Sequence, residues 1–196
     1  MAEITIDAIK KLKELSGVGL TDAKKALVEA DGDFDKALKA MREKGLTKAE
    51  KRGDRETREG VVSSYIHDNR LGAIVEVNCE TSFVANTDEF KELAHKLAMQ
   101  IASMNPLYVS EADIPEAAYN EKAAEFEANF KGPENMKDQI IEGQIKKAFA
   151  DKVLMLQPYI LDDSKTVAEF IKEMIAKTGE NITIRQFKRI ELGVNE

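Results

Sequence analysis

The chain has 196 residues, of which 43 % are hydrophobic and 33 % are charged, and its net charge at pH 7 is −7. This length fits one or two domains, and the hydrophobic share is too high for an intrinsically disordered chain. The acidic balance argues against direct nucleic-acid binding. The apolar runs fall short of the ~20 residues that cross a membrane. We therefore expect a cytoplasmic protein that binds neither nucleic acid nor a membrane directly.

Residues 1–46 have the pattern of three short helices. Gly17 ends the first helix, Thr21 is a suitable N-cap for the second, and Asp33 begins the third. Apolar positions recur at helical spacing as Ala8, Ile9, Leu12 and Leu15, then Ala23, Ala26, Leu27 and Ala30, then Phe34, Ala37, Leu38 and Met41. Three helices in so short a segment give a thin core, so we expect this domain to be marginally stable alone.

Residues 47–60, TKAEKRGDRETREG, contain many charges and no apolar side chain larger than Ala. Such a stretch cannot pack into a core, so we predict a charged linker between two domains. A solvated spacer and a partner-binding surface both fit this composition.

The second domain, residues 61–196, begins with two predicted strands. Val61–Ile66 and Ala73–Cys79 are rich in β-branched residues, and the polar residues 67–72 fit a hairpin turn. Ile74 is followed directly by another apolar residue, which is explained if both faces of the sheet are covered. The closing residues 182–192, ITIRQFKRIEL, alternate at their start and predict a third strand.

Helices are predicted between the second and third strands. Thr87 caps a strongly amphipathic helix, another runs from about Pro115 to Phe130, a third covers 134–150, and Thr166 opens a fourth with a capping box. The third of these helices places inward Met136, Ile140, Ile141, Ile145, Ala148 and Phe149. Strands, then helices, then a strand predict an α+β core in which a small antiparallel three-stranded sheet packs against helices.

Residues that carry covalent chemistry are scarce. Cys79 is the only cysteine, and the two histidines, His67 and His95, form no metal-binding motif. There is no glycine-rich phosphate-binding motif, so we expect no cofactor, no metal site and no enzyme activity. A hydrolase built on Cys79 is an alternative, but a nucleophilic thiol needs a nearby base, and only His67 across the hairpin offers one.

Two connectors are candidates for partner binding. Thr81-Ser-Phe-Val-Ala85 lies between a strand and a capped helix, and Phe83 in it is either a core plug or a projecting wedge. Gly17-Val-Gly-Leu20 forms a tight turn that leaves Leu20 partly exposed near Lys24.

These segments resemble the translation elongation factor Ts family. VEVNCETSFVAN is similar to the family signature VNCxTDFVA, and LAMQIA, QPYILDDSKTV and the closing strand are similar to later family segments in the same order. The resemblance implies that residues 1–46 form a domain like a ubiquitin-associated (UBA) domain. It implies a guanine-nucleotide exchange factor that binds elongation factor Tu with GDP, displaces Mg²⁺, promotes GDP release and holds the empty form until GTP binds.

The resemblance also implies which residues act. The Mg²⁺-displacing segment corresponds to four consecutive residues, Thr81, Ser82, Phe83 and Val84. The residues that contact elongation factor Tu correspond to Leu20 and Lys24, with Lys51 and Arg52 in the linker as further candidates. The family usually has Asp at the position of Ser82, and a hydroxyl forms weaker hydrogen bonds than a carboxylate, so we expect exchange to depend mainly on Phe83.

Short members of the family form homodimers, which predicts a symmetric dimer through residues 61–196. The alternative from a different class is an adaptor whose first domain binds ubiquitin or a peptide. It explains residues 1–46 and the linker, but it leaves VNCETSFVAN and QPYILDDSKTV without a role.

Overall fold

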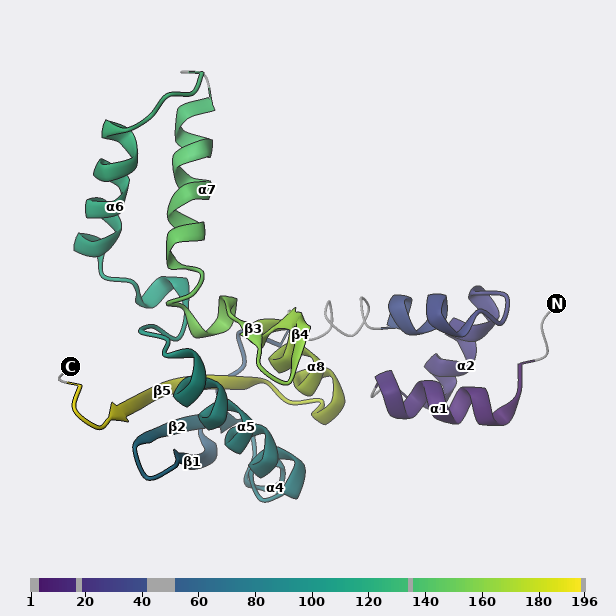
Figure 1. Cartoon of the computed structure of the whole chain (residues 1–196). Helices are drawn as coiled ribbons and strands as arrows, with labels where there is room; N and C mark the ends of the chain where they lie inside the picture. The colour runs from purple at the N-terminus through teal and green to yellow at the C-terminus, as the bar shows by residue number, and fades with distance from the viewer. Residues whose placement is uncertain (1–3, 17–18, 42–51, 134–135, 195–196) are drawn as a thin grey trace. The chain divides into compact units, whose positions relative to one another are not determined.

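The computed structural model describes residues 4–16, 19–41, 52–133 and 136–194. It confirms the predicted fold class, because three N-terminal helices precede an antiparallel three-stranded sheet that packs against helices (Figure 1). Contacts divide the chain into two compact units, namely residues 1–62 with 76–94 and 168–184, and residues 63–75 with 95–167 and 185–196. Within the described residues, no helix has the length and apolar character to span a membrane.

The N-terminal helices enclose their own small core. They are α1 (Ile6–Ser16), α2 (Leu20–Glu29) and a helical segment at residues 34–41. The core contains Ile9, Leu12, Ala23, Ala26, Leu27, Ala37 and Met41, all of them predicted. Two expectations, the side chain of Leu15 and the helix stop at Gly17, lie outside the described residues.

The caps of these helices match the prediction in one case and differ in the other. Asp33 caps the third helix, since its Oδ1 accepts a hydrogen bond from the backbone N–H of Lys36 at 3.0 Å. The prediction that Thr21 caps α2 was wrong. Gly19 occupies that position with extended backbone, and its carbonyl accepts the bond from the N–H of Ala23, so the helix begins at Leu20 without a side-chain cap.

Three strands form the sheet in the order β1 (Glu59–His67), β2 (Leu71–Cys79) and β5 (Ile182–Glu191). The β1–β2 turn contains Asp68 and Asn69, both with positive φ, a conformation that these residue types tolerate and tight hairpins favour. All three predicted strands are therefore confirmed: β1 and β2 are slightly longer than predicted, and β5 ends one residue earlier.

The prediction that both sheet faces are covered was wrong within the described chain. Ala73 and Val75 on β2 are buried, but Ile74 between them is 46 % exposed. Ile66 on β1 is 67 % exposed, and it lies beside Gly72, where an added Cβ would meet its side chain at 3.8 Å. Residues 72 and 74 share one face of β2, so Ile66 and Ile74 do so too.

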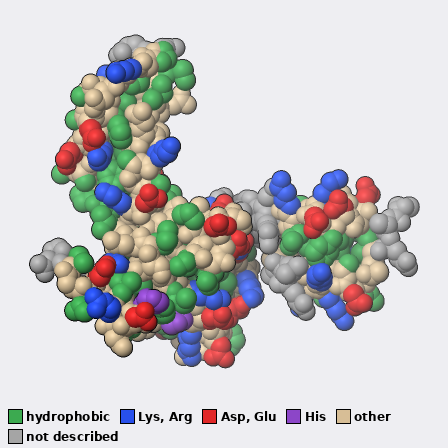
Figure 2. Space-filling view, in the orientation of Figure 1, with side chains coloured by type: hydrophobic (Ala, Val, Ile, Leu, Met, Phe, Trp, Pro, Cys, Tyr) green, Lys and Arg blue, Asp and Glu red, His purple; other side chains and the backbone are tan. Residues whose placement is uncertain are grey.

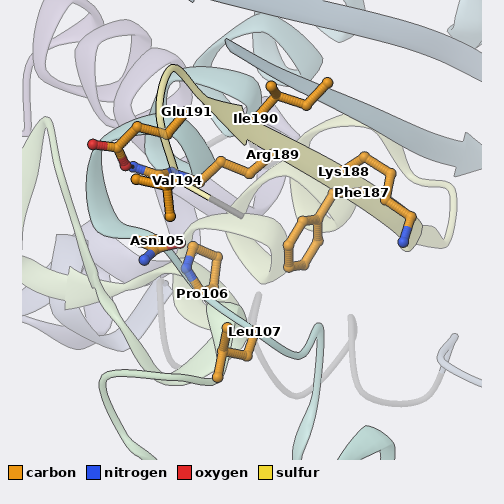
Figure 3. Close-up of a pocket in the computed structure, with 9 residues that line it drawn as sticks. All are labelled: Asn105, Pro106, Leu107, Phe187, Lys188, Arg189, Ile190, Glu191 and Val194. Atoms are coloured by element: carbon orange, nitrogen blue, oxygen red, sulfur yellow. Dashed lines mark hydrogen bonds and ion pairs between the residues drawn. The ribbon is translucent and has the colours of Figure 1, made fainter. Parts of the chain in front are cut away.

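Strand β5 adds a third isoleucine to this face. Arg189 donates from Nε to the carbonyl of Ala102 in α5 at 3.0 Å, so its side chain points to the helix side of the sheet. The next residue, Ile190, therefore points to the opposite face, is 74 % exposed, and turns away from Asn105 (Figure 3). We call Ile66, Ile74 and Ile190 the open sheet face.

The elements between β2 and β5 are mostly helical. They are α4 (Ser82–Ala85), α5 (Asp88–Met104), η1 (Glu111–Asp113), α6 (Glu116–Ala128), α7 (Lys137–Phe149), η3 (Leu154–Leu156), β3 (Pro158–Tyr159), β4 (Asp162–Thr166) and α8 (Val167–Thr178). Thr87 caps α5 as predicted, because its Oγ1 accepts from the N–H of Phe90 at 3.2 Å. The short β3–β4 ribbon was not predicted.

Helices α6 and α7 lie side by side as a hairpin (Figure 1). Ile141, Ile145 and Phe149 of α7 are buried in its core, as predicted. The expectation that Met136 faces inward was wrong, because it precedes the first turn of α7 and is 45 % exposed. One buried amide holds the neighbouring residues: Nε2 of Gln157 donates to the carbonyls of Met104 and Asp151 at 3.2 and 2.7 Å.

Candidate partner-binding site

The segment after β2 forms a single helical turn, α4, between β2 and the start of α5 (Figure 1). Thr81 has extended backbone and caps this turn, since its Oγ1 accepts a hydrogen bond from the N–H of Val84 at 3.4 Å. Val84 and Ala85 face the core and are 6 % and 5 % exposed. Phe83 points the other way and is 81 % exposed, the largest value among the exposed large apolar side chains described. The sequence left a core plug and a wedge equally open, and the structure has the wedge.

The surroundings of Phe83 are polar and open. Ser82 is exposed, and its carbonyl accepts a hydrogen bond from Nδ2 of Asn86 at 2.8 Å. Ser82, Phe83, Asn86 and Thr87 line a shallow hollow beside the turn. An exposed aromatic ring whose chain neighbours are buried suits an interface anchor, because the buried residues hold its backbone in place while the ring itself stays accessible to a partner.

Thr81 is held on several sides. Its backbone N–H donates to Oε2 of Glu180 at 3.0 Å, and its hydroxyl donates to Oε1 of the same carboxylate at 2.5 Å. Its carbonyl accepts from the thiol of Cys79 at 3.3 Å. Glu180 was missed by the sequence analysis. No local pattern marks it, because it lies 99 residues from Thr81 and meets it only in the folded chain.

Cys79 has the properties of a structural thiol. Its side chain is fully buried, and burial together with the negative charge of Glu180 raises the pKa of the thiol to about 11. A nucleophilic cysteine needs a lowered pKa, so this environment opposes the hydrolase alternative.

The two histidines belong to another cluster. The rings of His67 and His95 lie with their centroids 6.0 and 5.8 Å from that of Tyr65, and the histidines appear together in Figure 2. The hydroxyl of Tyr65 and Nδ1 of His67 are 2.9 Å apart. Among the described residues there is no group of three or more His, Cys, Asp or Glu that could hold a metal ion.

The N-terminal helices present a small apolar and basic strip on α2. Leu20, the first residue of the helix, is 50 % exposed, and Lys24 is exposed one turn later. Val28 follows after another turn and is 54 % exposed, so the three side chains share one helix face. The sequence analysis placed Val28 in neither the core nor the contact set, although the spacing of four residues predicts it.

Of the two linker candidates, Lys51 and Arg52, the structure describes only Arg52. Lys51 lies outside the described residues. Arg52 is half-buried, and its Nη1 donates to the carbonyl of Ile175 in α8 at 3.4 Å. Its guanidinium is therefore engaged within its own unit.

A second hollow lies at the end of β5 (Figure 3). It has a volume of about 470 Å³ and is lined by Asn105, Pro106, Leu107, Phe187, Lys188, Arg189, Ile190, Glu191 and Val194. Leu107 and Val194 on its rim are more than half exposed. Its arginine is paired, since Nη2 of Arg189 donates to Glu191 at 2.7 Å, so the hollow offers mainly apolar surface.

Comparison with known proteins identifies relatives over nearly the whole length of the chain. Residues 9–194 match the family model described as Elongation factor TS. The chain is 49 % identical over 193 residues to the elongation factor Ts of Thermotoga maritima, with 97 % of each chain covered. It is 48 % identical over 194 residues to that of Thermoanaerobacter pseudethanolicus, covering 97 % of this chain and 95 % of the relative. The elongation factor Ts of Rippkaea orientalis is 49 % identical over 198 residues, covering 98 % of this chain and 80 % of the relative.

Proposed function

The chain belongs to the elongation factor Ts family, the nucleotide exchange factors of elongation factor Tu in translation elongation, and from this premise we propose that it acts through the exposed turn Thr81–Val84. One observation carries the proposal: Phe83 is 81 % exposed while the next two residues are buried. Phe83 pushes between side chains near the nucleotide site of elongation factor Tu and disturbs the Mg²⁺ and phosphate contacts. GDP then leaves, and the empty form is held until GTP binds.

This activity needs no covalent chemistry. The factor binds the nucleotide-free state of its partner more tightly than the GDP state, and linkage requires GDP to weaken the factor by the same ratio. The family is one of exchange factors and not of enzymes, which excludes the hydrolase alternative. The family match spans residues 9–194, and it therefore accounts for the segments that the adaptor alternative left without a role.

The strip on α2 supports a second contact with elongation factor Tu. Leu20 and Lys24 supply it, and Val28 extends the apolar part of the same face. Lys51 and Arg52 remain candidates for contact with elongation factor Tu. Arg52 is the weaker of the two because its guanidinium already donates to the carbonyl of Ile175. We assign this contact to a domain of residues 1–46, joined by the charged stretch 47–60 to the core of residues 61–196.

Ser82 supplies the polar half of the turn. Its hydroxyl forms weaker hydrogen bonds than the carboxylate usual in the family, so the exposed ring beside it carries most of the effect. The variant Ser82→Asp should therefore accelerate exchange only modestly, whereas loss of the ring should nearly abolish it.

The open sheet face supports a homodimer. Ile66, Ile74 and Ile190 expose apolar surface on adjacent strands, and a second copy related by a two-fold axis would cover it. Cys79 is fully buried and does not bridge the copies. Light scattering at micromolar concentration should give twice the chain mass, and Ile74→Lys should give the monomer mass. A monomer for the unaltered protein would contradict this assignment. The dimer acts in the cytoplasm, where translation takes place.

Release of a fluorescent GDP analogue from elongation factor Tu at fixed Mg²⁺ tests the role of Phe83. Substoichiometric protein should accelerate release, and Phe83→Ala should reduce the rate at least about tenfold, as expected for an interface hot spot. Leu161→Ala is the matched control, because Leu161 is also a large, exposed apolar side chain. Undiminished exchange by Phe83→Ala would overturn the proposal.

A further inference from the structure

Two glutamates about one hundred residues apart each hold the backbone of the other's turn. The Oε2 atom of Glu180 accepts hydrogen bonds from the backbone N–H groups of Glu80 and Thr81 at 3.1 and 3.0 Å. Its Oε1 accepts the Thr81 hydroxyl at 2.5 Å. In return, Oε1 of Glu80 accepts the backbone N–H of Asn181 at 2.6 Å. The two turns are therefore locked together by reciprocal, charge-assisted bonds.

We propose that Glu180 is a positioning residue for nucleotide exchange, which aims Phe83 by fixing the hydrogen-bonding state of Thr81. The proposal rests on the function proposed above for Phe83. Glu180 does not itself touch the partner's nucleotide site. It acts only through Thr81, the residue that caps the helical turn carrying Phe83.

The chemistry of the Thr81 hydroxyl explains the coupling. A hydroxyl has one proton to donate and lone pairs to accept with. Because a carboxylate only accepts hydrogen bonds, the Thr81 hydroxyl donates its hydrogen to Glu180. A lone pair of Thr81 Oγ1 is then left to accept the N–H of Val84 at 3.4 Å. That bond caps α4. A helix of four residues has no stability of its own, so its direction depends on this cap and on the buried side chains of Val84 and Ala85.

Asn181, which follows Glu180, is buried and held by hydrogen bonds of its own. Asn181 is 2 % exposed, and its Nδ2 donates to the carbonyls of Gly53 and Arg55 at 3.1 and 2.7 Å. Nη1 of Arg55 also lies 3.3 Å from Oε1 of Glu80. The Glu180 turn thus connects the base of Phe83 to the segment that leads into β1, so the ring stands on several elements rather than on one loop.

Exposure separates positioning from folding here. Thr81 is exposed at its surface, so water can replace Glu180 at its donors and the chain should stay folded without that carboxylate. Water cannot fix the direction of the turn, however. Displacement of a reacting or inserting group by about 1 Å is enough to cost on the order of a hundredfold in rate.

The test measures GDP release from elongation factor Tu against the concentration of the full-length chain. Glu180→Ala should lower the maximal rate by about ten- to a hundredfold. It should change the half-saturating concentration much less, since the strip on α2 is untouched. Glu180→Gln should be intermediate, because its amide oxygen still accepts from the backbone but its NH₂ group cannot take the Thr81 proton.

Asp113→Ala is the matched control. The Asp113 carboxylate also accepts a backbone N–H and a hydroxyl from one residue, Ser110, at 2.8 and 2.7 Å, but it caps η1. It should leave the maximal rate unchanged. Circular dichroism melting checks that each variant is folded, and Glu180→Gln carries the test if Glu180→Ala does not fold.

The double variant Phe83→Ala with Glu180→Ala decides whether the two residues act together. If Glu180 acts through Phe83, the double variant should exchange no more slowly than Phe83→Ala alone. Two results would overturn the positioning role and leave the proposed function standing. One is a double variant whose loss of rate is the product of the two single losses. The other is an undiminished maximal rate for Glu180→Ala and Glu180→Gln while Phe83→Ala is slow. An undiminished rate for Phe83→Ala would overturn both.

Discussion

The exposure of Phe83 predicts that its loss separates function from stability. A phenylalanine offers about 150–250 Å² to burial, and with 81 % of Phe83 exposed only about a fifth of that area, roughly 40 Å², is covered. At about 25 cal/mol per Å², Phe83→Ala should cost at most about 1 kcal/mol of unfolding free energy. Phe90, seven positions later in α5, is fully buried, and Phe90→Ala should cost about 3–5 kcal/mol.

Urea denaturation followed by circular dichroism measures both values, and GDP release below the denaturation range measures function. Phe83→Ala should be stable but inactive, whereas Phe90→Ala should lose stability and retain exchange in proportion to the folded fraction. A loss above about 2 kcal/mol for Phe83→Ala would refute the reasoning, because it would mean that the ring packs against its own chain.

Three further predictions concern the framework. Gly60→Ala should destabilise the fold by about 1–3 kcal/mol in urea denaturation, because the added Cβ would lie 2.2 Å from the carbonyl oxygen of Val77. Raising the pH from 9 to 11 should lower the unfolding free energy, because the pKa of the Cys79 thiol is about 11 in the folded chain and 9.0 in the unfolded chain, so the folded chain holds the proton more tightly. In Cys79→Ala this part of the loss should vanish. Gln157→Ala should lower the melting temperature, because the carbonyls of Met104 and Asp151 lose their donor at about 0.5–1.5 kcal/mol for each hydrogen bond, yet exchange at 25 °C should persist. An unchanged stability in any of the three would contradict the contact concerned.

The location of Phe83 connects the fold to the proposed activity. Strand β2 and helix α5 are regular elements with buried side chains, and α4 is the short step between them. A wedge on such a step can bear against a partner without yielding, since the turn is held by Thr81 and by the buried Val84.

Local sequence determined most of the regular structure. The caps Asp33 and Thr87 bond to the backbone three residues ahead, and the apolar spacing of α5 and the β-branched residues of β2 need only neighbours along the chain. The failures at Thr21 and Met136 also have local causes, because helix ends depend on small backbone preferences that a glycine N-cap or an exposed first turn overrides.

Only the tertiary structure decided what the candidate site is. Whether Phe83 is a plug or a wedge depends on which faces of the turn the core already occupies, and Val84 and Ala85 occupy them. The role of Glu180 depends on a hydrogen bond across 99 residues, and the exposure of Ile74 depends on which sheet face the helices cover. These contacts join residues that are distant in sequence, so no periodicity or spacing in the chain could mark them.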